Sequence, residues 1–255
     1  MMFEFRGVLQ NAAMGVPAVR NLAARFHSTG MNGDTAAAAR MLAFYSAYVD
    51  VNGKDVLELG PGQTAEVLVH ARRAGARSCV GLDIQDYGLS DAPREPGVEV
   101  RLYDGRRLPL SAASVDIVWS SDVLEHVRYP DAVVSEVARV LRPGGIAISR
   151  IDLRDHYYLD REPKWFECLK YSEPMWRAIS WNRASFVNRL RASDWRRLFV
   201  EHGLATRAES TKQSEVLARL HAGRDVSRRV RAMSAEDAST YLIDLVVEKR
   251  NAVPA

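Results

Sequence analysis

The chain has little cysteine and no long apolar run. Its 255 residues include only two cysteines, Cys79 and Cys168, which give neither a disulfide framework nor the paired spacing of a metal site. No apolar run approaches the ~20 residues that a membrane-spanning helix needs. The longest uncharged N-terminal stretch, Gly7–Val19, is broken by polar residues and a proline, which is a poor signal-peptide pattern. We therefore expect a cytoplasmic protein.

Lysine is also scarce, with 5 lysines against 30 arginines, and the net charge is only +3. A net charge this small does not indicate a nucleic-acid partner. Ten of the arginines fall in two stretches, residues 183–197 and 219–231. Solvated helix faces explain such stretches in an arginine-rich chain. The alternative is a positive rim that binds an anionic substrate, such as a phosphorylated or nucleotide-linked sugar.

The most informative stretch is Val56–Glu66, with the sequence VLELGPGQTAE. An apolar run, two glycines and a helical pattern form a strand–turn–helix unit, which aims a helix N-terminus at a ligand. Gly60 and Gly62 lack a Cβ, so the backbone can approach a bound molecule closely. Asp83 closes a second apolar run 21 residues beyond Gly62. An acid at that place can accept hydrogen bonds from the ribose hydroxyls of an adenosine.

Two kinds of nucleotide site share this arrangement. The residues Gly60, Gly62 and Ala65 have the GxGxxA spacing of a dinucleotide-binding fold. A single match to this motif is weak evidence for that fold. An S-adenosylmethionine (SAM) site instead has an acid on the strand before the glycines, and Glu58 occupies that place. A carboxylate repels a pyrophosphate, whereas SAM carries an ammonium and a sulfonium and no phosphate. Pro61 also removes a backbone N–H donor, so the residues favour SAM.

Five stretches, in order and in spacing, resemble a class I SAM-dependent methyltransferase of the type 11 subgroup, which has an L-E-H-V motif. They are Val56–Gly62, Val80–Ile84, Tyr103–Leu110, Ser114–Val127 and Leu141–Gly145. The resemblance covers about Lys54–Asp152 and implies methyl transfer from SAM to a small-molecule or glycan acceptor. The chain departs from many members at Thr64, where they have a third glycine. Thr64 can then cap the following helix.

The resemblance also implies how the cofactor is held. Asp104 accepts a hydrogen bond from the adenine amine and the backbone after it meets the ring, although Asp104-Gly105 is also an ordinary turn dipeptide. The backbone of Ser120 and Ser121 meets the methionine end. The cofactor-binding residues that we expect are Glu58, Gly60, Pro61, Gly62, Asp83, Ile84, Asp104, Gly105, Ser120 and Ser121.

Strand and helix patterns alternate from Asp55 onwards. The expected strands are Asp55–Leu59, Ser78–Leu82, Val98–Leu102, Val115–Ser120, Ile146–Ile151, Leu204–Ser210 and Tyr241–Glu248. The expected helices are Thr64–Ala74, Ser121–His126, Asp131–Val140, Asn188–Phe199 and Ser214–Ala222. This alternation predicts an α/β fold with a Rossmann-like, doubly wound sheet of about seven strands, and the resemblance makes the last strand antiparallel.

Three parts of the chain are expected. Residues 1–50 form an N-terminal helical extension, which either lids the cofactor or only covers one face of the sheet. Residues 51–255 form the methyltransferase domain. Within it, residues 154–200 are an aromatic-rich insertion after strand five, which either lines the acceptor pocket or forms a small separate core.

Methyl transfer from a sulfonium is an in-line displacement, so positioning and water exclusion supply most of the catalysis. A poorly nucleophilic acceptor also needs a base. His156, beyond the fifth strand, is the first candidate and His126 the second, although His156 can be a plain loop residue and His126 a buttress. Asp122, Asp152 and Asp155 could gather around magnesium, but their spacing does not demand it and we assign no metal.

Three functions compete at this point. A SAM-dependent methyltransferase that acts on a small-molecule or glycan acceptor leads. A nicotinamide-dependent oxidoreductase on a dinucleotide-binding fold is the second. A catalytically silent SAM-fold protein that serves as a binding partner is the third, and the presence of Gly60, Gly62 and Asp83 argues against it.

Overall fold

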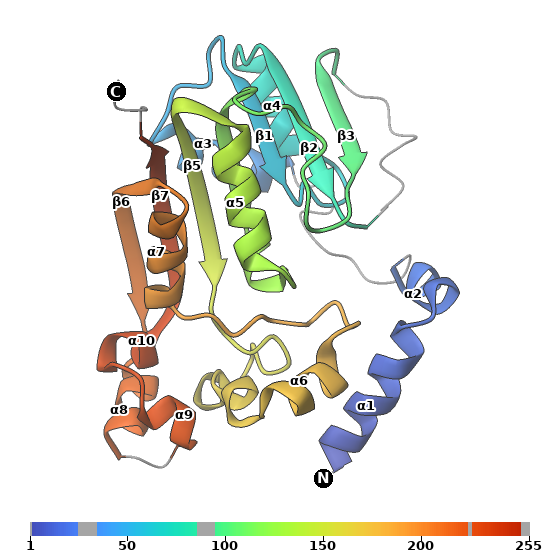
Figure 1. The fold of residues 1–255 in the computed structure, drawn as a ribbon, viewed down its shortest axis with the longest axis vertical. Helices are drawn as coiled ribbons and strands as arrows, with labels where there is room; N and C mark the ends of the chain where they lie inside the picture. Colours follow the sequence, from blue (N-terminus) through green and yellow to red (C-terminus); the bar gives the residue numbers. More distant parts are fainter. Residues whose placement is uncertain (1, 25–34, 86–94, 224–225, 251–255) are drawn as a thin grey trace.

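The computed structural model describes residues 2–24, 35–85, 95–223 and 226–250. In these residues seven strands form one sheet, in the order β3-β2-β1-β4-β5-β7-β6 (Figure 1). The strands are β1 Asp55–Leu59, β2 Ser78–Asp83, β3 Val98–Leu102, β4 Val115–Ser121, β5 Leu141–Asp152, β6 Leu204–Gln213 and β7 Thr240–Lys249. Strands β1 to β5 run parallel, and β7 pairs antiparallel with both β5 and β6. The predicted fold class is confirmed.

Helices cover both faces of the sheet because successive strand residues point to opposite sides. Val56 of β1 belongs to one apolar core, together with α3 Thr35–Ser46 and α4 Glu66–Arg73. Leu57 belongs to the other core, together with α5 Pro130–Val140 and α7 Ala192–Glu201. The strand order reverses between β1 and β4, which is the switch point where doubly wound sheets bind ligands.

Three local predictions were wrong. The helix expected at Ser121–His126 is a single 3-10 turn, Leu124–His126, because Asp122 adopts a left-handed conformation with φ +56° after the strand. Thr64 is not the cap of α4; the capping position is Ala65, at φ +52° and with an apolar side chain. The helix expected at Asn188–Phe199 begins only at Ala192.

A second group of helices lies beyond the carboxyl ends of the parallel strands (Figure 1). These helices are α6 Glu173–Ser180, α8 Glu215–Gly223, α9 Arg228–Arg231 and α10 Ala235–Ser239. They share a third apolar core, to which Phe166, Trp176, Leu217 and Val230 contribute. We call residues 154–187, 214–223 and 226–239 the cap. The aromatic insertion therefore forms a separate core, and it does so with a second segment that the sequence did not predict as its partner.

The N-terminal extension divides between the sheet and the cap. Helix α3 covers the sheet, whereas α1 Met2–Met14 packs on α6 and is followed by α2 Pro17–Ala24. The side chain of Asn11 donates to the carbonyl of Arg177 at 3.2 Å and accepts from the backbone N–H of Asn182 at 2.6 Å. These two hydrogen bonds fix α1 to the cap.

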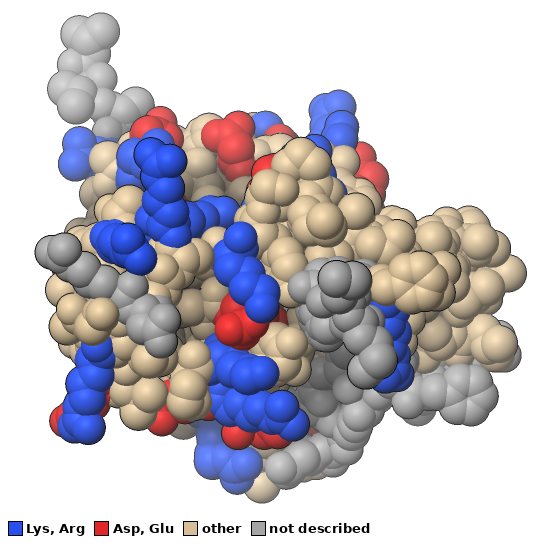
Figure 2. Space-filling model, turned by 90° about the horizontal axis from the view of Figure 1, so that it is seen from below, with Lys and Arg blue, Asp and Glu red and all other residues tan. Residues whose placement is uncertain are grey.

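The surface that carries the cap and helix α1 differs from one side to the other. Seen from below, Lys and Arg side chains are numerous over the middle and left of the molecule, while the protruding right-hand end carries few (Figure 2). Helix α1 lies on that right-hand side and exposes 69% of Phe5 and 57% of Leu9. Among the described helices, none combines the length and apolarity that crossing a membrane requires.

Candidate cofactor and acceptor site

The predicted site residues lie along one edge of the sheet. The parallel strands β1, β2, β4 and β5 all end at this edge, which faces the cap (Figure 1). The register places Leu59 of β1 beside Leu82 of β2 and beside Ser120 of β4. It also places Ser121 beside Arg150 of β5. The fold therefore brings together motifs that lie far apart in the sequence.

The glycine turn after β1 is closely packed. Gly60 and Gly62 have φ angles of +67° and +68°, which favour glycine. A Cβ on Gly60 would lie 2.5 Å from a methyl carbon of Val123. On the other side, a Cβ on Gly81 of β2 would lie 2.8 Å from the ring of Pro61. The turn is thus held between the ends of β2 and β4, and the role of Gly81 was missed by the sequence analysis.

Two nearly buried acids stand beside this turn. Glu58 is 6% exposed and Asp83 is 8% exposed. Burial and the nearby charge of Asp83 raise the pKa of Glu58 to about 8. Burial also raises the pKa of Asp83 to about 6, although backbone N–H groups such as that of Gln85 limit the change. A positively charged ligand would favour the ionised form of both acids.

The segments that follow β2 and β3 lie close together next to Asp83. The side chain of Ile84 is 53% exposed, and its methyl carbon lies 3.3 Å from the place that a Cβ on Gly105 would take. Asp104 accepts hydrogen bonds from the backbone N–H groups of Arg106 and Arg107 at 2.8 and 2.7 Å. Asp104 therefore closes a turn, as the simpler interpretation expected. A hollow of about 670 Å³ opens beside it.

The two serines at the end of β4 differ. Ser120 is buried, and its hydroxyl bonds the hydroxyl of Ser149 at 3.2 Å. Only the backbone of Ser120 is therefore available to a ligand. Ser121 donates to Asp122 at 2.9 Å, and the backbone N–H of Asp122 donates to the carbonyl of Arg150 at 3.0 Å.

Helix α3 places Tyr45 against Trp119 of β4, a contact that the sequence did not predict. Tyr45 stacks on Trp119 with ring centroids 4.5 Å apart and planes inclined by 6°. Trp119 is the register neighbour of Glu58, so both side chains point to the face that α3 covers. Within the described residues, the phenol oxygen of Tyr45, the indole nitrogen of Trp119 and one carboxylate oxygen of Glu58 have no hydrogen-bond partner that meets the usual geometry. Only an apolar spacing marked Tyr45 in the sequence.

His126 and His156 meet at the other end of the edge. Their rings are 4.7 Å apart at an angle of 72°. Nδ1 of His126 lies 2.6 Å from the carbonyl oxygen of Phe186, so this nitrogen carries the proton and donates it. Burial and the neighbouring His156 lower the pKa of His126 to about 4. His126 is therefore neutral and ties the cap to the strand edge.

His156 lies against an acid of β5. Its Nε2 is 3.5 Å from a carboxylate oxygen of Asp152. Arg154 also donates to that carboxylate, at 2.5 to 3.0 Å. Burial opposes ionisation of Asp152, but the contacts with His156 and Arg154 hold its pKa well below its usual range. The carboxylate of Asp152 can therefore orient the imidazole ring of His156 and stabilise its protonated form.

The three aspartates considered for magnesium do not form a common cation site among the described residues. Asp155 is buried in its own turn, where it accepts from the backbone N–H of Tyr157 at 2.9 Å. Asp152 is engaged by Arg154 and lies beside His156.

The first arginine stretch mostly builds the fold. Arg191 is buried and donates to the carbonyls of Leu153, Asp237 and Thr240. Arg189 is also buried and bonds backbone carbonyls and Glu173. Arg196 and Arg197 pair with acids. Arg183 differs, because its guanidinium lies 4.2 Å from the ring centre of Tyr157 in the cap.

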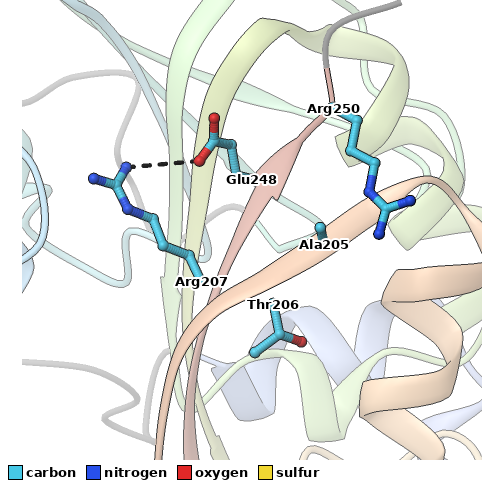
Figure 3. A pocket seen from close by; sticks show the side chains of 5 residues that line it. All are labelled: Ala205, Thr206, Arg207, Glu248 and Arg250. Carbon is cyan, nitrogen blue, oxygen red and sulfur yellow. Dashed lines mark ion pairs between the residues drawn. The ribbon is translucent and has the colours of Figure 1, made fainter. Parts of the chain in front are cut away.

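A smaller hollow of about 290 Å³ lies elsewhere (Figure 3). It is lined by Ala205, Thr206, Arg207, Glu248 and Arg250, and Arg207 pairs with Glu248 at 3.8 Å. The end of β7 that carries Glu248 is paired with the start of β5, at the edge opposite to the site. This hollow is therefore remote from the candidate chemistry.

Comparison with known proteins agrees with the geometry. Residues 57–149 match the family model for a methyltransferase domain. A probable S-adenosylmethionine-dependent methyltransferase of Mycolicibacterium smegmatis is 39% identical over 97 residues, which make up 37% of this chain and 36% of that protein. The match therefore spans only about a third of that relative's length.

Solved structures share the fold. An S-adenosylmethionine dependent methyltransferase from Mesorhizobium loti has a TM-score of 0.56 at 16% identity, over 86% of this chain and 100% of its own. The cyclase SpnF has a TM-score of 0.58 at 18% identity, over 98% of this chain and 94% of its own. At such low identity these likenesses show the fold alone. Together with the family match, they show that the chain contains a class I SAM-dependent methyltransferase domain.

Proposed function

We propose that this protein transfers the methyl group of SAM to a small-molecule acceptor bound between the strand edge and the cap. The observation that carries the proposal is the buried pair of acids, Glu58 and Asp83, beside the glycine turn. A dinucleotide would bring a pyrophosphate to this turn, where the carboxylate of Glu58 repels it. SAM brings an ammonium and a sulfonium instead, and these favour the ionised form of both acids.

The cofactor-binding residues follow from this placement. Asp83 binds the ribose hydroxyls, and Glu58 stabilises the positively charged methionine end. Gly60, Pro61 and Gly62 form the turn beneath the cofactor. The adenine ring lies beside Asp83, next to Ile84, Asp104 and Gly105, and the backbone of Ser120 and Ser121 meets the methionyl part.

The His156–Asp152 pair supports an acceptor that must lose a proton, such as a hydroxyl. In the proposed step the acceptor oxygen forms a bond to the methyl carbon as the carbon–sulfur bond breaks. S-adenosylhomocysteine (SAH) leaves, and the ring nitrogen of His156 that faces away from Asp152 takes the acceptor proton. The charge of Asp152 stabilises the imidazolium that results. His126 is the second candidate base, but its Nδ1 is committed to the Phe186 carbonyl.

The side chains of the cap favour one class of acceptor. A glycan phosphate needs free cations, and most arginines of the first stretch are paired or donate to backbone carbonyls. Arg183 stacks on Tyr157, and Arg128 lies 5.7 Å from the ring centre of Trp181. Aromatic rings with cations on their faces suit a planar or weakly anionic small molecule better than a phosphorylated sugar.

The test has two parts. First, the melting temperature of the protein is measured with SAH, with NAD and with NADP; we expect only SAH to raise it. Second, SAM labelled in its methyl group is incubated with the protein and a panel of hydroxylated small molecules, and the labelled product is identified. Stabilisation by a nicotinamide dinucleotide in place of SAH would overturn the proposal. Stabilisation by SAH without any labelled product would favour a silent SAM-binding protein.

A further inference from the structure

Glu125, His126 and His156 form a compact group at the inner end of the acceptor site. Each offers one ligand atom, and these atoms all lie within 4.8 Å of one another. Glu125 and His126 belong to the 3-10 turn after β4, and His156 belongs to the loop after β5. We propose that these three side chains bind one divalent transition-metal ion.

The carboxylate of Glu125 is buried and only partly hydrogen-bonded. It is only 2% exposed, and one of its oxygens accepts the backbone N–H of Asp152 at 3.3 Å. The other oxygen is buried and accepts no hydrogen bond from the part of the chain that the structure describes. A buried carboxylate oxygen without a partner is costly, and a bound cation supplies the missing partner.

Each of the two histidines has one ring nitrogen directed at a protein oxygen. His126 donates from Nδ1 to the carbonyl of Phe186 at 2.6 Å, which leaves the lone pair on Nε2 for a ligand. Metal-binding histidines usually have their second ring nitrogen held in this way, which fixes the tautomer and the direction of the ring. Nε2 of His156 is buried and faces a carboxylate oxygen of Asp152 at 3.5 Å, which leaves the other ring nitrogen of His156 for the ion. Asp152 is thus placed to support His156 from the outer shell.

Two imidazoles and one carboxylate favour a transition metal. Zinc, cobalt, manganese and ferrous iron accept this ligand set, whereas magnesium and calcium prefer oxygen ligands. Ligands bound at about 2.0–2.2 Å from zinc lie about 3.5 Å apart. The ligand atoms lie within 4.8 Å of one another, so the group contracts by at most about 1.3 Å when the ion binds. The ring of His156, on the loop after β5, is the ligand that closes the group.

If the protein has the proposed function, a bound metal should inhibit methyl transfer. A lone pair of His156 that is bound to a metal cannot take a proton. The loaded protein should therefore lose base-dependent methyl transfer, and a chelator should restore it. Binding of the metal itself does not depend on SAM or on an acceptor, so the two proposals can fail separately.

The experiment uses the full chain after dialysis against a chelator. Cobalt(II) is added without SAM, visible absorption is recorded, and zinc and magnesium are titrated by calorimetry. We expect one cobalt or zinc ion per chain, with absorption bands of a site of low coordination number, and no comparable magnesium binding. Glu125→Gln and His156→Gln should weaken zinc binding by about 10-fold to 100-fold or more.

His202→Gln is the matched control. His202 is also a histidine paired with a carboxylate, Asp131, at 2.9 Å, but it lies on the surface outside the group. This variant should bind zinc as the wild type does. Absence of cobalt and zinc binding in the wild type would overturn the proposal, and this result does not depend on any variant folding. Equal zinc affinities of the wild type, Glu125→Gln and His156→Gln would overturn it as well.

Discussion

The carboxylate of Asp83, at the end of β2, raises the pKa of Glu58 on the neighbouring strand β1. Both side chains are more than nine-tenths buried, and burial is the larger cause of the raised pKa of each. Two acids that resist ionisation side by side are a frequent mark of a functional site. Here they are poised to gain charge when a positive ligand arrives.

We expect the affinity for SAM to rise with pH. A positive ligand binds best when both acids are ionised, and their pKa values are about 6 for Asp83 and about 8 for Glu58. The dissociation constant should therefore fall between pH 6 and 8, and binding should release protons. Calorimetry in buffers of different ionisation enthalpy measures both. In Glu58→Gln the upper part of this pH dependence should disappear; an affinity that is flat or falls with pH in the wild type would contradict the assignment.

The same acid should make the free protein less stable in alkali. The folded-state pKa of Glu58 is raised to about 8, above its unfolded value of about 4.3, so its contribution is fully present below pH 4 and is lost as pH rises through 8. A tenfold difference in proton affinity between the folded and unfolded protein corresponds to about 1.4 kcal/mol of stability. Glu58→Gln should therefore unfold in urea like the wild type at pH 4.5, yet be more stable by about 2 kcal/mol or more at pH 9. Equal stabilities at pH 9 would argue against a buried, protonated Glu58.

The close packing at Gly60 can be tested by comparison with Gly53, where a Cβ would meet no other atom within 4 Å. Gly60 and Gly53 both have positive φ angles, +67° and +70°, but a Cβ at Gly53 meets nothing within 4 Å. Gly53→Ala should cost about 1 kcal/mol of strain. Gly60→Ala should cost more, because its Cβ would lie 2.5 Å from Val123, and it should also weaken SAM binding. Urea unfolding and calorimetry measure the two effects. If the two alanine variants behave alike, close packing at the turn is not what fixes the glycine.

His156→Gln separates base catalysis from positioning. If His156 takes the acceptor proton, turnover should fall by about 10²–10⁴-fold while the SAM dissociation constant stays nearly constant. The wild-type rate should also rise with pH as the base loses its proton, and the variant should lose that rise. His202→Gln, a surface histidine paired with Asp131, should behave as the wild type. Wild-type turnover in His156→Gln, with the pH profile intact, would leave positioning as the mechanism.

The strands and the site edge were predictable from the sequence. The strands expected at Asp55–Leu59 and Val98–Leu102 have these bounds in the structure. The strand β1 shows as an apolar run because a parallel sheet buries both faces of its central strands. The strand β3 lies at the edge of the sheet and shows only an alternation of Val98 and Val100 with charged residues. Once those strands are parallel, Glu58, Asp83 and Ser121 must reach a common edge. Local pattern and topology were sufficient for that part of the site.

What remained unpredicted depends on contacts between distant segments. Glu125 and His156 lie 31 positions apart, and only the pairing of β4 with β5 brings them together. Tyr45 covers Trp119 because α3 packs on the sheet, which an apolar helix pattern does not specify. The sequence also could not show that Arg191 is buried among backbone carbonyls, because a charged side chain on a helical pattern normally indicates a solvated face.

The most direct test of the SAM site is a calorimetric titration of SAH into the wild type, Asp83→Asn and Asp131→Asn. Asp131 is an exposed acid on α5, and its replacement should leave binding unchanged. Asp83→Asn should lose about 2–3 kcal/mol of binding free energy, as expected when a charged acceptor of hydrogen bonds is removed. Micromolar binding of SAH to the wild type with this selective loss is the predicted result. Equal affinities of all three proteins, or no binding to the wild type, would contradict it.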